Sequence, residues 1–325
     1  MDQMSDGIGE SAATQSTDIL RVPHDKRLII AATLTAGLTY ALVVLGSTVR
    51  VTDSGMGCPS WPLCYNQLGP IFHLHPILEE SHRYLASIVT ISALVTLYLS
   101  YKTKTAQATR RFAQFAFGLV IFQVLLGGLT VLTKNAPWTV TVHLITGLVF
   151  LASTTATAVV AIRSGSSFKL SNLAKSWGGV TFGATLVLLV SGSLVVASGA
   201  GSACPTWPVC FATGQTRLVD VALVHRSMAF LAGAAIIRLV ALGWKGATST
   251  WHWAAASLMT VLGLVAMLGA FSAISKSNPT WADLHLAMAA LLWVLLTILI
   301  VDSKESSDRS PDPQLNDDSL TELGR

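Results

Sequence analysis

Glu79-Glu80-Ser81-His82-Arg83 lies where a polar loop with two cysteines enters a long apolar run. A histidine just inside a membrane helix, with a carboxylate one turn earlier, is typical of a functional site, because ionisable side chains are costly inside a bilayer. The His-Arg pair recurs as His225-Arg226, but the position that matches Glu79 is Ala222. The repetition predicts two related units, and the difference predicts that only one of them carries an acid.

Composition places the chain in a membrane. Of its 325 residues, 52% are hydrophobic and only 12% are charged, whereas a soluble domain carries about 25% charged residues. No basic stripe alternates with aromatic residues, so no nucleic-acid partner is expected. Apolar runs long enough to span a bilayer, about 20 residues each, begin near Leu28, Tyr84, Phe112, Val140, Trp177, Val221, Trp253 and Ala282. The sequence therefore predicts an all-α integral membrane protein with eight transmembrane helices.

The basic residues predict the orientation of these helices. Eight spans place both termini on one side, and 15 of the 21 Lys and Arg residues fall on that side. By the positive-inside rule we expect a multi-pass protein of the cell membrane with both termini cytoplasmic and the cysteine loops outside. The six outer cations form a collar for an anionic ligand, or they are side chains that snorkel to the interface. We prefer snorkelling for Arg217. The six are Arg50, Arg83, Lys134, Arg217, Arg226 and Lys276.

An internal repeat divides the chain. The segment Cys58-Pro59-Ser60-Trp61-Pro62-Leu63-Cys64 recurs at an offset of 146 as Cys204-Pro205-Thr206-Trp207-Pro208-Val209-Cys210, and His143 recurs at an offset of 142 as His285. A near-constant offset indicates two pseudo-symmetric four-helix bundles in the same orientation. We expect the bundles over residues 28–163 and 177–301, with a cytoplasmic linker over 164–176. Disordered cytoplasmic tails are expected over 1–27 and 302–325.

All four cysteines fall in predicted outer loops, as the pairs Cys58/Cys64 and Cys204/Cys210. The oxidising side of a membrane permits disulfides, so one interpretation is two local disulfides that pin the loops. A redox-active pair that exchanges with a partner is a second interpretation. A zinc site is a third, although structural zinc usually uses closer cysteine spacing. The Trp-Pro inside each loop suggests a rigid aromatic lid.

Four histidines share one depth. His82, His143, His225 and His285 lie a few residues inside the outer ends of the second, fourth, sixth and eighth predicted helices. Within each half, two imidazoles can converge on a planar iron porphyrin, because imidazole is a good iron ligand and a helix bundle can enclose the macrocycle. The alternative for any one histidine is a hydrogen bond between helices. Cations placed to meet the anionic propionates are Arg50, Arg83, Lys134, Arg226 and Lys276.

The halves differ beside the first histidine. Glu79 and Glu80 correspond to Ala222 and Leu223, so only the first half has a carboxylate there. Glu79 shares a helix face with the histidine three residues later, where it could act as a general base or stabilise a cation. The alternative is a charge that caps the helix N-terminus, and Glu80 is expected to be such an interfacial charge. The sequence thus predicts a catalytic first half and an electron-carrying second half.

These motifs resemble the haem A synthase family, membrane enzymes that complete the haem of cytochrome oxidase. The resemblance covers residues 28–301 and rests on Val49-Arg50, Ser54-Gly55, both cysteine loops, Glu79-x-x-His82-Arg83, His143-Leu144, His225-Arg226 and His285-Leu286. It implies a haem b cofactor on His225 and His285, substrate haem O near His82 and His143, and a catalytic Glu79. The implied reaction oxidises the C8 methyl of haem O to a formyl group by successive hydroxylations. Some relatives lack one or both cysteine pairs, so the cysteines need not be catalytic.

Further partners follow from this resemblance. No flavin or nicotinamide motif is present, so an external electron carrier is expected, together with haem O synthase, cytochrome oxidase assembly factors and the lipid bilayer. The pair Gly127-Gly128 would also allow a homo-oligomer, because small residues let helices approach closely. Two rival functions remain open at this point. One is a non-catalytic dihaem b-type cytochrome that exchanges electrons with quinone, and the other is a haem transporter or chaperone.

Overall fold

Eight long helices make up most of the computed structural model, which describes residues 25–67, 72–103, 105–163, 172–211, 216–244 and 249–304. All eight are long and apolar enough to cross a membrane, and the described residues contain no strand. The prediction of an all-helical membrane protein is therefore confirmed. In chain order the elements are α2 (Lys26–Val51), α3 (Leu74–Lys102), α4 (Gln107–Leu132), α5 (Pro137–Ile162), α6 (Asn172–Ser198), the short 3-10 helix η2 (Ala200–Ser202), α7 (Thr216–Trp244), α8 (Ser249–Ile274) and α9 (Pro279–Lys304).

The helices extend beyond the apolar runs. Helix α3 begins ten residues before the apolar run that predicted it, so Glu79 and His82 lie on its second and third turns. Helix α6 begins inside the predicted linker, and α2 and α9 take in the ends of the predicted tails. The helices continue into polar residues, and at the start of α2 a cap supports this, because Asp25 Oδ1 accepts from Arg27 N at 2.8 Å. Residues 1–24, 164–171 and 305–325 lie outside the described residues.

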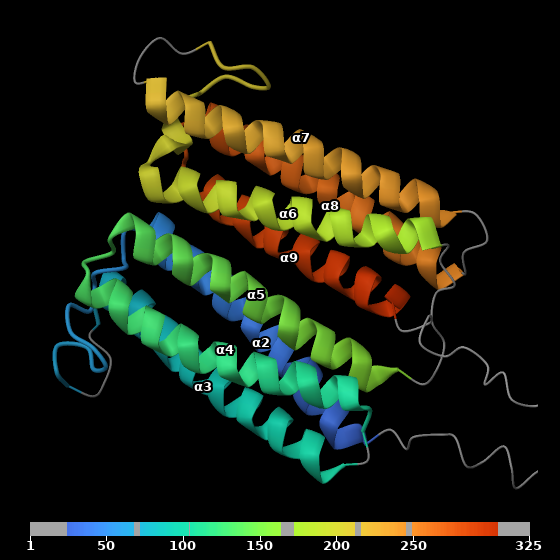
Figure 1. Cartoon of the computed structure of the whole chain (residues 1–325). Helices are drawn as coiled ribbons and strands as arrows, with labels where there is room; N and C mark the ends of the chain where they lie inside the picture. Colours follow the sequence, from blue (N-terminus) through green and yellow to red (C-terminus); the bar gives the residue numbers. More distant parts are fainter. Residues whose placement is uncertain are drawn as a thin grey trace, which may run out of the picture.

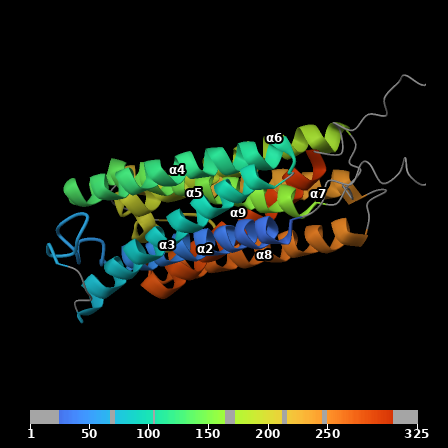
Figure 2. The same ribbon diagram turned by 90° about the horizontal axis from the view of Figure 1, so that it is seen from below.

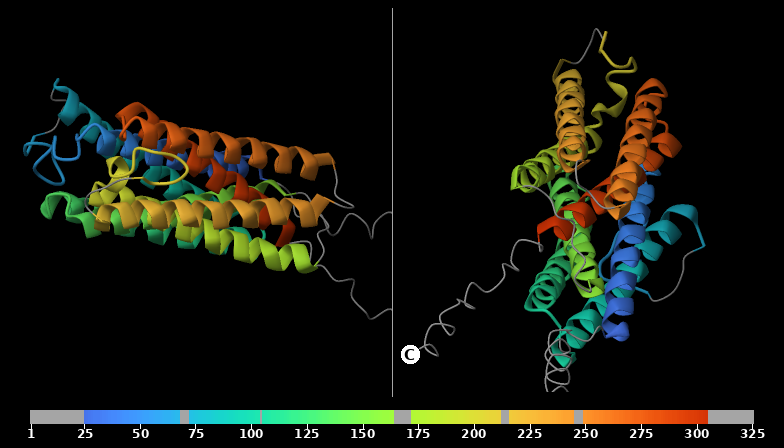
Figure 3. Two further views of the ribbon diagram at one scale, coloured as in Figure 1. Left: turned by 90° about the horizontal axis from the view of Figure 1, so that it is seen from above. Right: turned by 90° about the vertical axis from the view of Figure 1, so that its right-hand side faces the viewer.

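Two groups of helices lie side by side (Figure 1). Helices α2 to α5 form one group and α6 to α9 the other, with α2 packed on α3, α4 on α5, α6 on α7 and α8 on α9. Figure 2 shows that the helices run roughly parallel to one another. In the end view of Figure 3, α2, α5, α6 and α9 lie between the outer helices of the two groups. The described chain begins and ends at one end of the molecule, and both cysteine loops lie at the other (Figure 1).

Polar contacts join the two groups. Trp293 Nε1 on α9 donates to Leu148 O on α5 at 2.8 Å, and both side chains belong to a core cluster that spans the two groups. Near the cysteine loops, Thr48 Oγ1 donates to Asp283 Oδ2 at 2.8 Å. At the other end, Arg163 pairs with Asp302. The two groups therefore share one core and have fixed positions relative to each other.

The interiors of the two groups differ in side-chain size away from the cysteine loops. In the first group a small cavity is lined entirely by alanine and threonine, namely Ala32, Thr35, Ala93, Thr96, Ala113, Ala116, Thr154 and Thr157. The repeat offsets match Ala93, Thr96 and Ala116 with Ile236, Leu239 and Leu258, which are fully buried in the second group. The second group is thus filled by large aliphatic side chains where the first is lined by small ones.

Candidate functional site

Both cysteine pairs form disulfides in the structure. The Cα atoms are 4.7 Å apart for Cys58 and Cys64 and 5.5 Å apart for Cys204 and Cys210, within the usual range for a bridge. The two local pairings are therefore confirmed. Each loop is folded in the same way, because a hydroxyl two residues after the first cysteine donates to the backbone three residues on, as Ser60 does at 2.6 Å and Thr206 at 2.7 Å.

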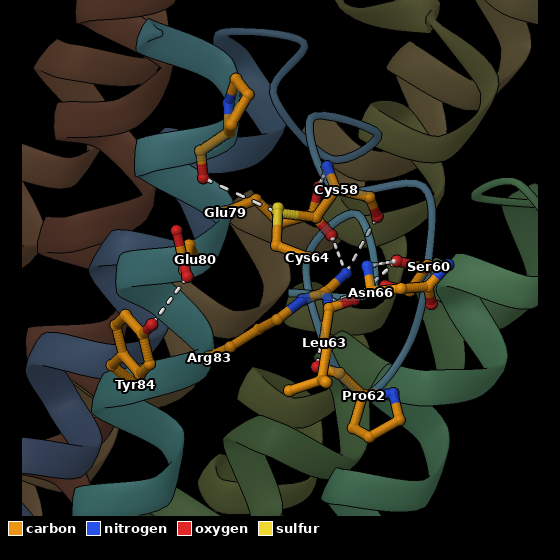
Figure 4. The surroundings of a disulfide bond; sticks show 11 residues. Cys58, Ser60, Pro62, Leu63, Cys64, Asn66, Glu79, Glu80, Arg83 and Tyr84 are labelled. Atoms are coloured by element: carbon orange, nitrogen blue, oxygen red, sulfur yellow. Dashed lines mark hydrogen bonds and ion pairs between the residues drawn. A yellow bond between two sulfur atoms is a disulfide. The ribbon is translucent and has the colours of Figure 1, made fainter. Parts of the chain in front are cut away.

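Arg83 holds the first loop against α3 (Figure 4). Its Nη1 donates to Ser60 O at 2.8 Å and to Pro62 O at 3.3 Å, and its Nη2 donates to Cys58 O at 3.0 Å. A planar guanidinium with several fixed donors suits such a set of acceptors better than an ammonium would. Arg83 is therefore the main link between this loop and the helix that carries His82.

Arg226 repeats the arrangement in the second half. Its Nη1 donates to Thr206 O at 2.7 Å and to Pro208 O at 3.1 Å, and its Nη2 donates to Cys204 O at 2.7 Å. The sequence repeat thus extends to individual hydrogen bonds. Both guanidinium groups bind loop carbonyls here, and the expectation that they bind propionates stays a prediction.

Glu79 is the exception to this symmetry. Its Oε1 accepts from Arg83 Nη2 at 2.6 Å, and its Oε2 accepts from Cys58 N at 2.8 Å, so it joins the arginine to the start of the loop (Figure 4). The side chain is buried, with 5% of the residue exposed. At the matching position the second half has Ala222, which has no carboxylate. A buried carboxylate held by a cation and an amide is a fixed negative charge at the edge of the first bundle.

Glu80 is buried as well, and its expected role as an interfacial charge stays a prediction. Tyr84, one turn further along α3, donates its hydroxyl to Glu80 Oε1 at 2.6 Å. Figure 4 shows this pair on the side of the helix away from the disulfide. The two neighbouring glutamates therefore have separate surroundings, and only Glu79 contacts the loop.

The first loop also rests on α4. The indole of Trp61 lies against Gly128, where an added Cβ would come within 2.8 Å of Trp61 Cε2. Asn135 Nδ2, just past the end of α4, donates to Gly55 O at 2.8 Å. This placement agrees with the aromatic lid expected from the Trp-Pro sequence. Trp61 thus contacts Gly128, and the preceding residue in the sequence, Gly127, contacts the ring of His143.

Each of the four histidines packs on a glycine of the preceding helix. The shortest distance from the imidazole to an ideal Cβ on that glycine is 2.9 Å for Gly46 with His82, 3.5 Å for Gly127 with His143, 3.1 Å for Gly192 with His225 and 2.9 Å for Gly269 with His285. In every case the nearest ring atom is Cε1. The four glycines keep the repeat offsets of 146 and 142. A missing side chain on one helix therefore makes the space for an imidazole from the next.

The second pair of imidazoles converges. The ring centroids of His225 and His285 are 6.5 Å apart and the ring planes lie at 88°. His225 Nδ1 contacts Ser191 Oγ at 3.0 Å, and His285 Nδ1 contacts Val265 O at 3.0 Å. The Nδ1 atom of each ring is thus engaged by the protein.

The first pair is held differently. The Nδ1 atoms of His82 and His143 are buried, and neither has a hydrogen-bond partner among the residues that the structure describes. The two bundles therefore have equivalent histidines, but only those of the second bundle have a hydrogen-bond partner on Nδ1.

The remaining expected cations lie at the same end of the molecule. Lys134 and Lys276 both adopt positive φ, 53° and 56°, in the turns that follow α4 and α8. Arg50, in the last turn of α2, reaches across to Val196 O at 3.5 Å. Val196 is its own counterpart in the repeat, so Arg50 lies near the axis that relates the two halves. The cationic collar expected from these residues stays a prediction.

Comparison with known proteins identifies the family. Residues 30–297 match the family model COX15-CtaA, described as cytochrome oxidase assembly protein. The chain belongs to this family. Three proteins named Heme A synthase are similar to it. The match to that of Exiguobacterium sibiricum is 29% identical and covers 64% of this chain and 72% of the relative.

The other two matches differ in extent. That of Geobacillus kaustophilus is 29% identical over 59% of this chain and 62% of the relative, and that of Bacillus cereus is 26% identical over 83% of this chain and 94% of the relative. The last alignment spans nearly the whole relative and includes both halves of the COX15-CtaA fold. Membership of this family implies that haem is involved.

The second pair of histidines fits a haem iron. Two imidazoles that share one metal at the usual nitrogen–metal distance of about 2 Å have ring centres roughly 6 Å apart. The separation of 6.5 Å between His225 and His285 agrees with this value. The glycines behind the rings keep the imidazoles in place without filling the space between them. The residues present in this COX15-CtaA protein therefore fit the group that its family implies.

Several contributing residues were not assigned a role from the sequence. No role was predicted for Gly46, Gly192 and Gly269, and Gly127 was expected only to let helices approach closely, although these glycines recur together with the histidines. Ser191 gave no signal, because its counterpart in the first half is Leu45 and the repeat breaks there. The loop-binding role of the two arginines depends on how the loops fold, which charge patterning does not predict.

Proposed function

We propose that this chain is a haem A synthase, which oxidises the C8 methyl of haem O to a formyl group for cytochrome oxidase. Family membership supports the reaction class. The observation that carries the assignment of roles is Glu79, a buried carboxylate three residues before His82 on α3 with no counterpart in the second half. We therefore assign substrate oxidation to the bundle of residues 28–163 and electron transfer to that of residues 177–301.

In the first bundle, His82 and His143 bind the substrate haem O. Glu79 is the catalytic residue, and it stabilises positive charge that develops at the methyl group or accepts a proton from water. Its two hydrogen bonds, from Arg83 and from Cys58 N, hold the carboxylate in one position before the reaction begins. A carboxylate has about four lone-pair sites, so it retains acceptor capacity for the reacting group.

In the second bundle, His225 and His285 would hold haem b as the resident cofactor. Bound there, the haem would supply one-electron transfer. The protein orients both imidazoles, through Ser191 and Val265 O, and packs them on Gly192 and Gly269. Away from the disulfide loops, this bundle is filled by large buried side chains such as Leu258.

The sidedness follows from the positive charges. Both termini lie in the cytoplasm and the disulfide loops face the outer side. On that side Arg50, Lys134 and Lys276 attract the propionates of the two haems. Arg83 and Arg226 also bind propionates when they exchange a loop carbonyl for a carboxylate. Haem O enters from the bilayer, supplied by haem O synthase. The product passes to cytochrome oxidase assembly factors.

The rival dihaem cytochrome accounts for four histidines but gives no role to Glu79. The two functions are separated by extracting haem from membranes of cells that make haem O, with and without the protein, followed by chromatography. Haem A synthase activity produces haem A or its hydroxylated intermediate only where the protein is present. Unchanged haem O alongside a stoichiometric bound haem b would refute the enzyme and support the electron carrier.

A further inference from the structure

The hydrogen bonds of the second pair of histidines define which ring nitrogen carries the proton. Ser191 Oγ donates to Leu188 O at 2.7 Å, which leaves the lone pairs of the hydroxyl to accept from His225 Nδ1 at 3.0 Å. His285 Nδ1 contacts the carbonyl of Val265, which can only accept. Both rings therefore carry hydrogen on Nδ1. Nε2 of each ring has a free lone pair directed away from these partners.

The first pair lacks this arrangement. His82 and His143 have buried Nδ1 atoms without a hydrogen-bond partner in the described part of the chain. The repeat explains the first of these, because the residue at the position of Ser191 is Leu45, which has no hydroxyl. At the position of Val265 the first half has Gln123, and no main-chain carbonyl of the described residues, that of Gln123 included, accepts from His143 Nδ1.

Such outer hydrogen bonds have a known effect on metal ligation. A histidine that donates its second N–H to a fixed acceptor is held in one tautomer and orientation and becomes a stronger ligand, and loss of the acceptor typically lowers metal affinity by about 10- to 100-fold. The second half has this support on both of its histidines. The first half has it on neither, which suits a site that must release its product.

We propose that Ser191 is the positioning residue that fixes His225 as a strong axial ligand, and that Leu45 at the matching position leaves His82 a weaker, exchangeable one. This single difference helps to make one bundle retain its haem and the other exchange it. The inference rests on the proposed function, because it takes both pairs of histidines to bind haem. It concerns a residue to which neither the sequence motifs nor the family resemblance assigns a role.

The test measures haem release from the full-length protein in detergent. Protein loaded with two equivalents of haem b is mixed with excess apomyoglobin, and transfer is followed by absorbance. Wild-type release is expected to be biphasic, with a fast phase from the first bundle and a slow phase from the second. Ser191→Ala removes the acceptor, and Ser191→Thr retains a hydroxyl. Ser193→Ala is the matched control, because Ser193 lies one position beyond Gly192 and donates only to Val190 O, at 2.7 Å.

Ser191→Ala is expected to accelerate the slow phase by about 10- to 100-fold and to shift the electron paramagnetic resonance spectrum of the low-spin ferric haem. Ser191→Thr and Ser193→Ala are expected to match the wild type. Leu45→Ser is expected to slow the fast phase. An unchanged slow phase and spectrum in folded Ser191→Ala would overturn the proposal. If that variant does not accumulate, Leu45→Ser decides, since an unchanged fast phase overturns the proposal and a slower one supports it.

The same experiment separates this inference from the proposed function. A wild-type protein that takes up no haem would refute the proposed function and the inference together. A wild-type protein that binds two haems, combined with Ser191→Ala that behaves like it, would refute only the role of Ser191.

Discussion

Replacing Gly269 by alanine tests how closely the glycines and histidines fit. An ideal Cβ at this position would lie 2.9 Å from His285 Cε1, 3.1 Å from Nδ1 and 3.6 Å from Nε2, whereas non-bonded carbon atoms prefer about 3.5–4.0 Å. The imidazole must therefore move back by roughly half an ångström or more. That movement strains its hydrogen bond to Val265 O, which is 3.0 Å long, and changes the position of the ring relative to His225.

The expected cost follows from three contributions. Overpacking of a filled interior costs about 1–3 kcal/mol, and a weakened hydrogen bond costs about 1 kcal/mol. The better helix propensity of alanine stabilises the folded protein by about 1 kcal/mol relative to glycine. We therefore expect Gly269→Ala to lower the free energy of unfolding by about 1–3 kcal/mol. The same variant should lose haem from the second bundle or show a changed spectrum of the haem that remains.

Two alanine variants serve as controls for this prediction. Gly127→Ala occupies the matching place in the first half, where the nearest ring atom of His143 is 3.5 Å away, an ordinary contact. Gly263→Ala lies on the same helix as Gly269 and meets no atom within 4 Å. Both should fold at least as stably as the wild type by thermal unfolding in detergent. The reasoning fails if Gly269→Ala equals Gly263→Ala in unfolding midpoint, haem content and haem spectrum.

Three further substitutions have expected outcomes. Arg83→Lys replaces a guanidinium that binds three loop carbonyls. Amide hydrogen exchange in residues 58–64 should accelerate at least about tenfold, which corresponds to the loss of about one net hydrogen bond. Unchanged exchange would show that the disulfide alone orders the loop. Trp293→Phe removes the buried hydrogen bond between the two groups and should cost about 1–2 kcal/mol in thermal unfolding, whereas Trp253→Phe, at a residue 75% exposed, should have no effect. Leu258→Ala opens a cavity at a residue that is 0% exposed and should cost about 2–5 kcal/mol, and a smaller loss would mean that the second bundle collapses around the site.

The number of helices was predictable because each apolar run must satisfy its backbone inside the bilayer, and only a helix does so within one segment. The helix ends were not predictable from hydropathy. Helix α3 begins at Leu74, well before the apolar run, and places Glu79 within a helix rather than at its first residue. The internal repeat gave the depth and pairing of the histidines, since equal offsets within equivalent helices produce equivalent positions.

The roles of individual polar side chains were harder to predict. Arg83 and Arg226 were expected to meet anionic ligands because they lie beside histidines on the outer side. A guanidinium also binds neutral carbonyls when a folded loop presents several of them in a plane, and the fold of each cysteine loop does this. Ser191 was missed because a serine within an apolar helix commonly bonds to its own backbone. Its second contact depends on how α6 packs against α7.

The division of labour between the two bundles is tested most directly by Glu79→Gln. The variant is produced in cells that make haem O, and its bound haem and the haem extracted from the membranes are measured on the same sample. The amide keeps the volume of the side chain but removes its negative charge. We predict that the protein retains one haem b while the membranes accumulate haem O without haem A. Formation of haem A at the wild-type level by Glu79→Gln would contradict the assignment of catalysis to the first bundle.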